Sequence, residues 1–198
     1  MNRIAIFACL LTLIITTEAL YAETIDRRLG ITGRIGFLIP ADSTAQNGNI
    51  STDVTFLGGG GVIFGFDRNL AAECEITRTQ YDASGALNGD FTATTISFGL
   101  QYRLDAPLHH PTPYIGGGFD IVMADFENHE GTALDVDTVV GIHLSGGIDY
   151  FIQKELALNA EAKLVMAPDA DIRLAGTKVG NYDPMNINGT IGIRYFFN

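Results

Sequence analysis

A histidine and a serine that could act as base and nucleophile lie two positions apart, in His143-Leu144-Ser145. Residues two apart in an extended strand share one face, so the imidazole and the hydroxyl would point the same way. A glutamate that oriented the imidazole would complete the arrangement of a serine hydrolase. If the substrate were a lipid, His143 and Ser145 would have to lie on the apolar face of the strand. Leu144 belongs to that apolar face, so His143 and Ser145 lie on the opposite one. We therefore expect no catalytic residues.

Other residue types with chemical potential lack the spacing that a site would need. His109, His110 and His129 fall in polar connections without paired spacing, so no metal site is expected. The glycines 58–61 precede neither Lys-Ser/Thr nor a helix, which argues against a phosphate loop. Cys74 lies among apolar neighbours and is interpreted as a small hydrophobic residue. No cofactor is predicted.

The first 22 residues have the features of a secretory signal peptide. A basic start at Arg3 precedes an apolar stretch from Ile4 to Ile15, and Leu20-Tyr21-Ala22 is a plausible cleavage site. Residues 23–198 then form the mature domain, in which Cys74 has no cysteine partner. The formal net charge of the 198-residue chain is −11, which argues against nucleic acid as a partner.

The stretch from Met185 to Phe197 alternates between two unlike faces. Met185, Ile187, Ile191, Ile193, Tyr195 and Phe197 share one face, and Asn186, Asn188, Thr190, Arg194 and Phe196 share the other. A period of two predicts a strand. An apolar face of this length that ends in aromatic residues is typical of a strand that crosses a membrane.

Seven earlier segments alternate in the same way, and short and long connections follow one another between them. They are Leu29–Pro40, Val54–Phe66, Leu70–Tyr81, Phe91–Leu104, Pro113–Phe126, Thr138–Phe151 and Glu155–Met166. Polar loops are expected at Asp42–Asp53, Asp82–Asp90, Glu127–Asp137 and Asp169–Asp183, which hold 11 of the 23 acidic residues. The predicted fold is all-β: an eight-stranded antiparallel up-and-down transmembrane β-barrel with outward acidic loops.

The second face of each strand carries charges of both signs, which would point into the lumen. The predicted lumen-facing charges are Arg34, Glu73, Glu75, Arg103, Asp120, Asp149, Glu161, Lys163 and Arg194. An eight-stranded barrel is nearly filled by its side chains, so a salt-bridged plug is expected. The alternative is that some charges flank a narrow path, and the inward residues Leu57, Ile63 and Phe196 admit an apolar upper pocket. A soluble barrel would put the aliphatic face inside and leave these charges outside.

Four segments together resemble the OmpW family of small outer-membrane barrels. They are Arg34-Ile35-Gly36 followed by Pro40, the strand Pro113–Gly118, the hairpin start Gly147–Ile152, and Asp183-Pro184 followed by Gly192–Phe196. Met185 stands where that family has tryptophan, and the chain ends in Phe197-Asn198 rather than in phenylalanine. The Pro-Pro segment that helps to shape the interior of the family is replaced by Phe91–Thr95.

The resemblance implies an integral protein of the Gram-negative outer membrane, in contact with lipid and lipopolysaccharide. It further implies passive passage of small hydrophobic molecules through a narrow pocket that opens near the outer leaflet. The alternative is a non-conducting structural barrel of the adhesion type, whose acidic loops meet the outside. A third hypothesis is a lipid A deacylase, since such barrels carry a His-x-Ser pair on a strand. The residues around His143 match the OmpW-like hairpin better.

Overall fold

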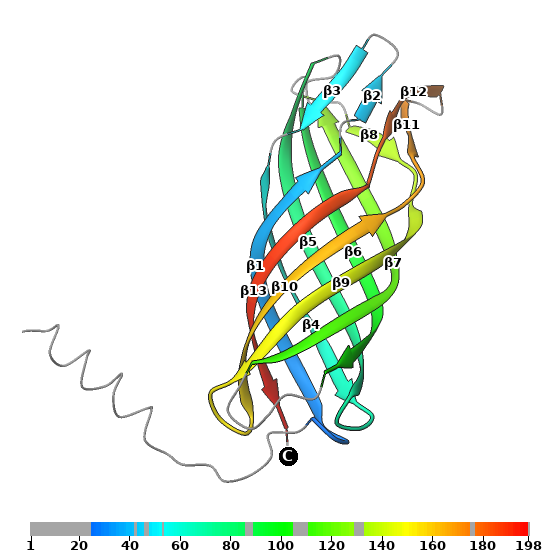
Figure 1. Cartoon of the computed structure of the whole chain (residues 1–198). Helices are drawn as coiled ribbons and strands as arrows, with labels where there is room; N and C mark the ends of the chain where they lie inside the picture. Colours follow the sequence, from blue (N-terminus) through cyan, green and yellow to red (C-terminus); the bar gives the residue numbers. More distant parts are fainter. Residues whose placement is uncertain are drawn as a thin grey trace, which may run out of the picture.

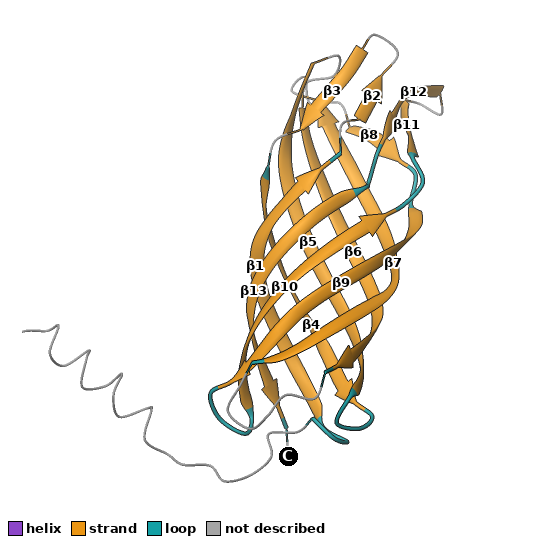
Figure 2. Ribbon diagram, in the orientation of Figure 1, coloured by secondary structure: helices purple, strands orange, loops and turns teal. Residues whose placement is uncertain are grey.

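The computed structural model describes residues 25–41, 43–45, 48–52, 54–85, 89–104, 111–128, 133–174 and 177–197. These ranges contain thirteen strands of one antiparallel sheet and no helix (Figure 1, Figure 2). Within them, no helix is long and apolar enough to cross a membrane. Eight long strands form the barrel: β1 (Leu29–Pro40), β4 (Thr55–Gly65), β5 (Leu70–Gly85), β6 (Gly89–Arg103), β7 (Thr112–Asn128), β9 (Val139–Phe151), β10 (Leu156–Met166) and β13 (Asn186–Phe196).

The barrel closes because β1 pairs with both the second long strand and the last one. Arg34 lies opposite Gly59 of β4 on one side and opposite Gly192 of β13 on the other. Following the register once around the barrel leads from Thr112 of β7 back to Val122 of β7, a shift of ten residues (122 − 112). A shear of this size goes with strands tilted by about 35–45°, and the tilt is plain in Figure 1.

The two faces of each strand meet different surroundings, as the alternation predicts. On β1, Ile31, Ile35 and Phe37 are 48%, 53% and 63% exposed, whereas Thr32 and Arg34 are buried. A wall with aliphatic side chains outside and charged ones inside is stable only when lipid covers the outside. The prediction of a transmembrane barrel with eight spanning strands is confirmed.

Apolar side chains close the lower end of the barrel, where the C-terminus lies (Figure 1). Ile25, Ile63, Ala71 and Phe196 form a buried cluster there, with Phe151 packed against it. The Arg28 guanidinium holds the closing seam, because it donates to the carbonyl oxygens of Lys154 and Phe196 at 2.6 and 3.0 Å. The lower lumen therefore has no open entrance between these side chains.

The upper end differs from the prediction, because the expected loops contain strands. The long strands β5, β6 and β7 continue above the predicted boundaries, and five short strands extend the wall (Figure 1). These are β2 (Ser43–Ala45), β3 (Gly48–Thr52), β8 (Ala133–Val136), β11 (Ala170–Leu174) and β12 (Thr177–Tyr182). Here the wall stands above the lipid, so its outer face is not covered by lipid. No continuous apolar face then marks the strands in the sequence.

Candidate functional site

Arg34 lies at the centre of the lumen and contacts three carboxylates from two other strands. Its guanidinium nitrogens are each 2.7 Å from an oxygen of Glu73, Glu75 and Glu161. The contacts to Glu73 and Glu161 are aligned hydrogen bonds, while the Nε contact to Glu75 is an ion pair without that alignment. Glycines stand opposite Arg34 on both neighbouring strands, so no side chain there competes for the space that the guanidinium needs.

A second cluster lies below Arg34 and is centred on Arg194. Arg194 is fully buried, and its guanidinium is 3.1 Å from Glu73 and 2.9 Å from Asp149. Arg103 also pairs with Asp149, whose other oxygen accepts a 2.7 Å hydrogen bond from Asn159. Since Glu73 contacts both Arg34 and Arg194, it joins the two clusters into one network.

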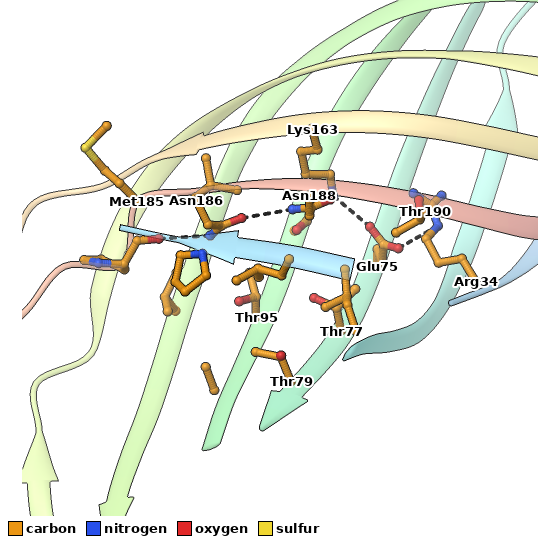
Figure 3. A pocket seen from close by; sticks show the side chains of 18 of the residues that line it. Arg34, Glu75, Thr77, Thr79, Thr95, Lys163, Met185, Asn186, Asn188 and Thr190 are labelled. Carbon is orange, nitrogen blue, oxygen red and sulfur yellow. Dashed lines mark hydrogen bonds and ion pairs between the residues drawn. The ribbon is translucent and has the colours of Figure 1, made fainter. Parts of the chain in front are cut away.

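Lys163 and Glu75 form the upper surface of this network. The Lys163 ammonium lies 2.8 Å from Glu75, whose second oxygen contacts Arg34 (Figure 3). These contacts and the clusters below them bring together eight of the nine charges that the sequence places in the lumen. We call this network of Arg34, Glu73, Glu75, Arg103, Asp149, Glu161, Lys163 and Arg194 the charge plug.

The ninth charge, Asp120, pairs instead with His143. The Asp120 Oδ2 atom is 2.9 Å from His143 Nδ1, and both side chains are buried inside the barrel. Among the described residues, Asp120 Oδ1 has no hydrogen-bond partner. Leu144, the next residue, is 60% exposed on the outer face, so His143 and Ser145 lie on the lumen side of β9. The His-x-Ser pair therefore does not face the membrane lipid.

The three apolar residues expected in the lumen lie at two different heights. Leu57 is buried beside the upper cavity described below. Ile63 and Phe196 are fully buried in the lower cluster and line no upper pocket. The alternation of the strands puts all three inside but does not give their height, because the tilt of the strands sets it.

A cavity lies above the charge plug, in the upper half of the lumen (Figure 3). Its lining residues surround about 600 Å³ of empty space, open solvent included, and only about 30 Å³ of it admits the centre of a water molecule. The space is therefore a narrow crevice. Its apolar lining is Leu38, Leu57, Ala93, Val122, Val165 and Tyr182, and its polar lining includes Thr77, Thr79, Thr95, Ser97, Asn186, Asn188 and Thr190.

A buried apolar cluster covers this cavity from above. It consists of Ala93, Val122, Ala124, Ala170, Ile172 and Tyr182, contributed by β6, β7 and the β11–β12 hairpin. Three of its members, Ala170, Ile172 and Tyr182, come from the segment Asp169–Asp183, which the sequence predicts as a loop. The cavity thus lies between an apolar cover and a charged floor.

Sequence reasoning did not select several polar residues that the structure places in the lumen. Tyr114 donates to Glu161 at 2.8 Å and accepts from Asn159 at 3.0 Å, while Gln101 donates to Glu73 at 2.5 Å. The threonines and asparagines around the cavity form the other missed set. All lie at inward-pointing positions of their strands. The alternation of the strands could therefore have identified them.

Some predictions lie outside the described residues. They concern the signal peptide at residues 1–22 and the histidines His109, His110 and His129. In the part of the chain that the structure describes, no group of three histidine, cysteine, aspartate or glutamate side chains is arranged to hold a metal ion.

Comparison with known proteins agrees with this architecture. The sequence matches the Outer membrane protein beta-barrel domain family over residues 6–195. The chain belongs to this family. It is an integral protein of the outer membrane, since its closed barrel presents an apolar wall to lipid. No curated relative matches the sequence.

Solved structures of small outer-membrane barrels share the fold. OprG from Pseudomonas aeruginosa is 17% identical with a TM-score of 0.72, covering 90% of this chain and 100% of its own. AlkL is 15% identical with a TM-score of 0.59, covering 92% and 96%. The outer membrane protein W of E. coli is 14% identical with a TM-score of 0.51, covering 87% and 98%. The likeness to OmpW-type barrels is thus confirmed for the fold.

Proposed function

We propose that this barrel is a passive path by which small, mainly apolar molecules cross the outermost layer of the outer membrane. The observation that carries the proposal is the upper cavity, whose lining includes Leu38, Leu57, Val122 and Val165. Such side chains favour apolar solutes over ions, because burying apolar surface is favourable while stripping an ion of water is costly. A concentration gradient would supply the direction.

The route leaves the barrel sideways, because the floor of the cavity is closed. A solute moving straight down would have to separate Lys163 from Glu75 and then pass the apolar cluster around Phe196. The cavity reaches the outer wall at the β1–β13 seam, where its lining includes Pro40 and the exposed Met185.

Filling the cavity is expected to stop uptake. In the Leu57→Trp variant the larger side chain occupies the crevice, so entry of an apolar fluorescent reporter into proteoliposomes falls to the rate of empty liposomes. The matched control is Phe56→Trp, which places the same side chain on the lipid face of the same strand. Heat-dependent gel migration verifies that both variants are folded. Equal uptake by Leu57→Trp and the unaltered protein would count against a path through this cavity.

The path acts without catalysis. His143 and Asp120 resemble two members of a hydrolytic triad, but they are held inside the wall and away from lipid. We expect His143→Ala to leave the acylation of lipid A unchanged, as measured by mass spectrometry of extracted lipid A. A loss of deacylated lipid A in cells carrying the variant would restore the enzyme hypothesis.

A surface-interaction barrel is the second candidate, favoured by the strands that extend above the membrane. Exposed ion pairs link β11 with β12 and with the segment between β8 and β9, where Arg173 of β11 lies 3.1 Å from both Asp137 and Asp171. The Lys178 ammonium, 2.6 Å from Asp171, lowers the pKa of that carboxyl, so the pair stays charged from neutral pH down to below the usual range of an aspartate. An adhesive role would use this charged rim.

The rim can be altered without touching the cavity. Asp137→Asn combined with Asp171→Asn should weaken attachment of cells to a surface if the barrel is adhesive, while reporter uptake stays unchanged. Neither residue lines the upper cavity. Unchanged attachment would remove the support for this candidate.

A further inference from the structure

The geometry points to a selective site in the upper cavity for short, unbranched, neutral molecules that carry a hydroxyl group, such as primary alcohols. This inference rests on the proposed function, and it adds a substrate class to the path. A purely apolar path would be lined by aliphatic groups throughout. This cavity instead has polar groups among its aliphatic ones, and the polar groups are what requires an explanation.

Hydroxyl and amide groups face one another across the cavity. Thr77, Thr79 and Thr95 of β5 and β6 lie on one side, and Asn186 and Asn188 of β13 lie on the other (Figure 3). The asparagines form a polar track from the rim downward. Asn186 Nδ2 donates to the carbonyl of Pro184 at 2.9 Å, and Asn188 Nδ2 donates to Asn186 Oδ1 at 3.0 Å. A hydroxyl group would find partners along the whole depth of the crevice.

Thr190 supplies the second observation, at the lower end of this track. Its side chain is 94% buried (6% exposed) in the cavity lining, and its Oγ1 atom has no hydrogen-bond partner among the described residues. A buried polar atom without a partner costs about 1–3 kcal/mol. A ligand hydroxyl can both donate and accept, so it satisfies Thr190 where an alkane cannot.

The floor of the cavity excludes charged ligands. Lys163 and Arg34 could attract an anion, but both already contact Glu75, at 2.8 and 2.7 Å. An added carboxylate would compete with Glu75 for the same cations, and an added ammonium would compete with the cations for Glu75. Separating a buried pair is costly, so a neutral head group is favoured.

The shape of the crevice selects the body of the ligand. Only about 30 Å³ of the 600 Å³ of empty space admits the centre of a water molecule, so the opening between facing side chains is thin. An unbranched chain can thread such a space, whereas a ring or branched chain cannot. The aliphatic groups of the lining, Leu57 and Val165 among them, are the surface that such a chain would contact.

The test is methyl NMR of the full barrel in lipid nanodiscs, with labelled threonine methyl groups. The probes are 1-butanol and n-pentane, which have the same number of non-hydrogen atoms, and butyrate as the charged probe. We expect 1-butanol alone to shift the Thr77, Thr79 and Thr95 signals. Thr94, the next residue along β6, points outward by strand alternation and reports how much each probe contacts the outside of the barrel.

The decisive variant is Thr190→Val, which keeps the shape of the side chain and removes the unpartnered hydroxyl. We expect 1-butanol to bind about fivefold more weakly to it, while the barrel resists urea unfolding at least as well. If Thr190 had only a structural role, weaker 1-butanol binding in the Thr190→Val variant would be accompanied by lower stability of the barrel. The control is Thr32→Val, because the Thr32 hydroxyl bonds to Glu73 at 3.3 Å and lies outside the cavity.

Three outcomes would overturn the inference. The first is equal shifts from n-pentane and 1-butanol at the same Thr94 shift, which would make the cavity simply apolar. The second is 1-butanol binding that Thr190→Val leaves unchanged, and the third is no 1-butanol binding at all. The proposed uptake role fails separately, if the unaltered barrel does not speed entry of the apolar reporter into liposomes.

Discussion

Arg34→Met is expected to destabilise the barrel by about 3–5 kcal/mol, because the change leaves buried carboxylates without their shared cation. Arg34 contacts Glu73, Glu75 and Glu161, and all four side chains are at most 8% exposed. Lys163 and Arg194 remain near two of the carboxylates. Among the described residues, the one hydrogen-bond partner left to Glu161 is the Tyr114 hydroxyl, so Glu161 bears the largest part of the loss.

The measurement is the urea concentration at which the barrel unfolds in lipid vesicles. The folded fraction is read from its mobility on a gel. Ile35→Met is the matched control, since it puts the same side chain one position away on the lipid face. Adding Glu161→Gln to Arg34→Met should recover part of the stability, because it removes the charge with the fewest remaining partners. If Arg34→Met unfolds at the same urea concentration as the control, the charge plug does not stabilise the lumen.

The sequence alone predicted which side chains face the lumen, because a strand permits only two phases. A lipid-covered wall cannot tolerate charges at its centre, so the charged phase of each strand had to be the inner one. Arg34, Glu73 and Arg194 were assigned in this way, and all are in the lumen. Their pairing was not accessible, because it depends on the shear of ten residues that sets the relative height of strands far apart in the chain.

The upper wall and the cavity were missed for a different reason. Alternation is a strong signal only where one face meets lipid and the other does not. Around Ile172 and Tyr182 the chain stands above that boundary, and its strands read as polar loops. Thr190 and Asn188 were placed on the inner face of the last strand. The sequence does not show whether an uncharged inward residue packs against its neighbours or lines a cavity.

Gly118→Ala is expected to disrupt the wall itself, at a cost of about 3 kcal/mol or more. A methyl group on this inward glycine would overlap the carbonyl oxygen of Phe98 and lie 2.7 Å from the Cα of Gly99, both on the paired strand β6. It would also lie 2.9 Å from His143 Cε1. Backbone atoms cannot move away as a flexible side chain can, so β6 and β7 would have to separate locally.

Two further variants identify the cause of that cost. Gly33→Ala adds the same methyl group on the lipid face, where nothing lies within 4 Å, and we expect its urea midpoint to match that of the unaltered barrel. Adding His143→Ala to Gly118→Ala relieves the contact with the imidazole but not the two with β6. We therefore expect no recovery from it. Full recovery of stability in the double variant would mean that the added methyl group is crowded by the His143 side chain. The spacing of β6 and β7 at Gly118 would then tolerate a Cβ atom.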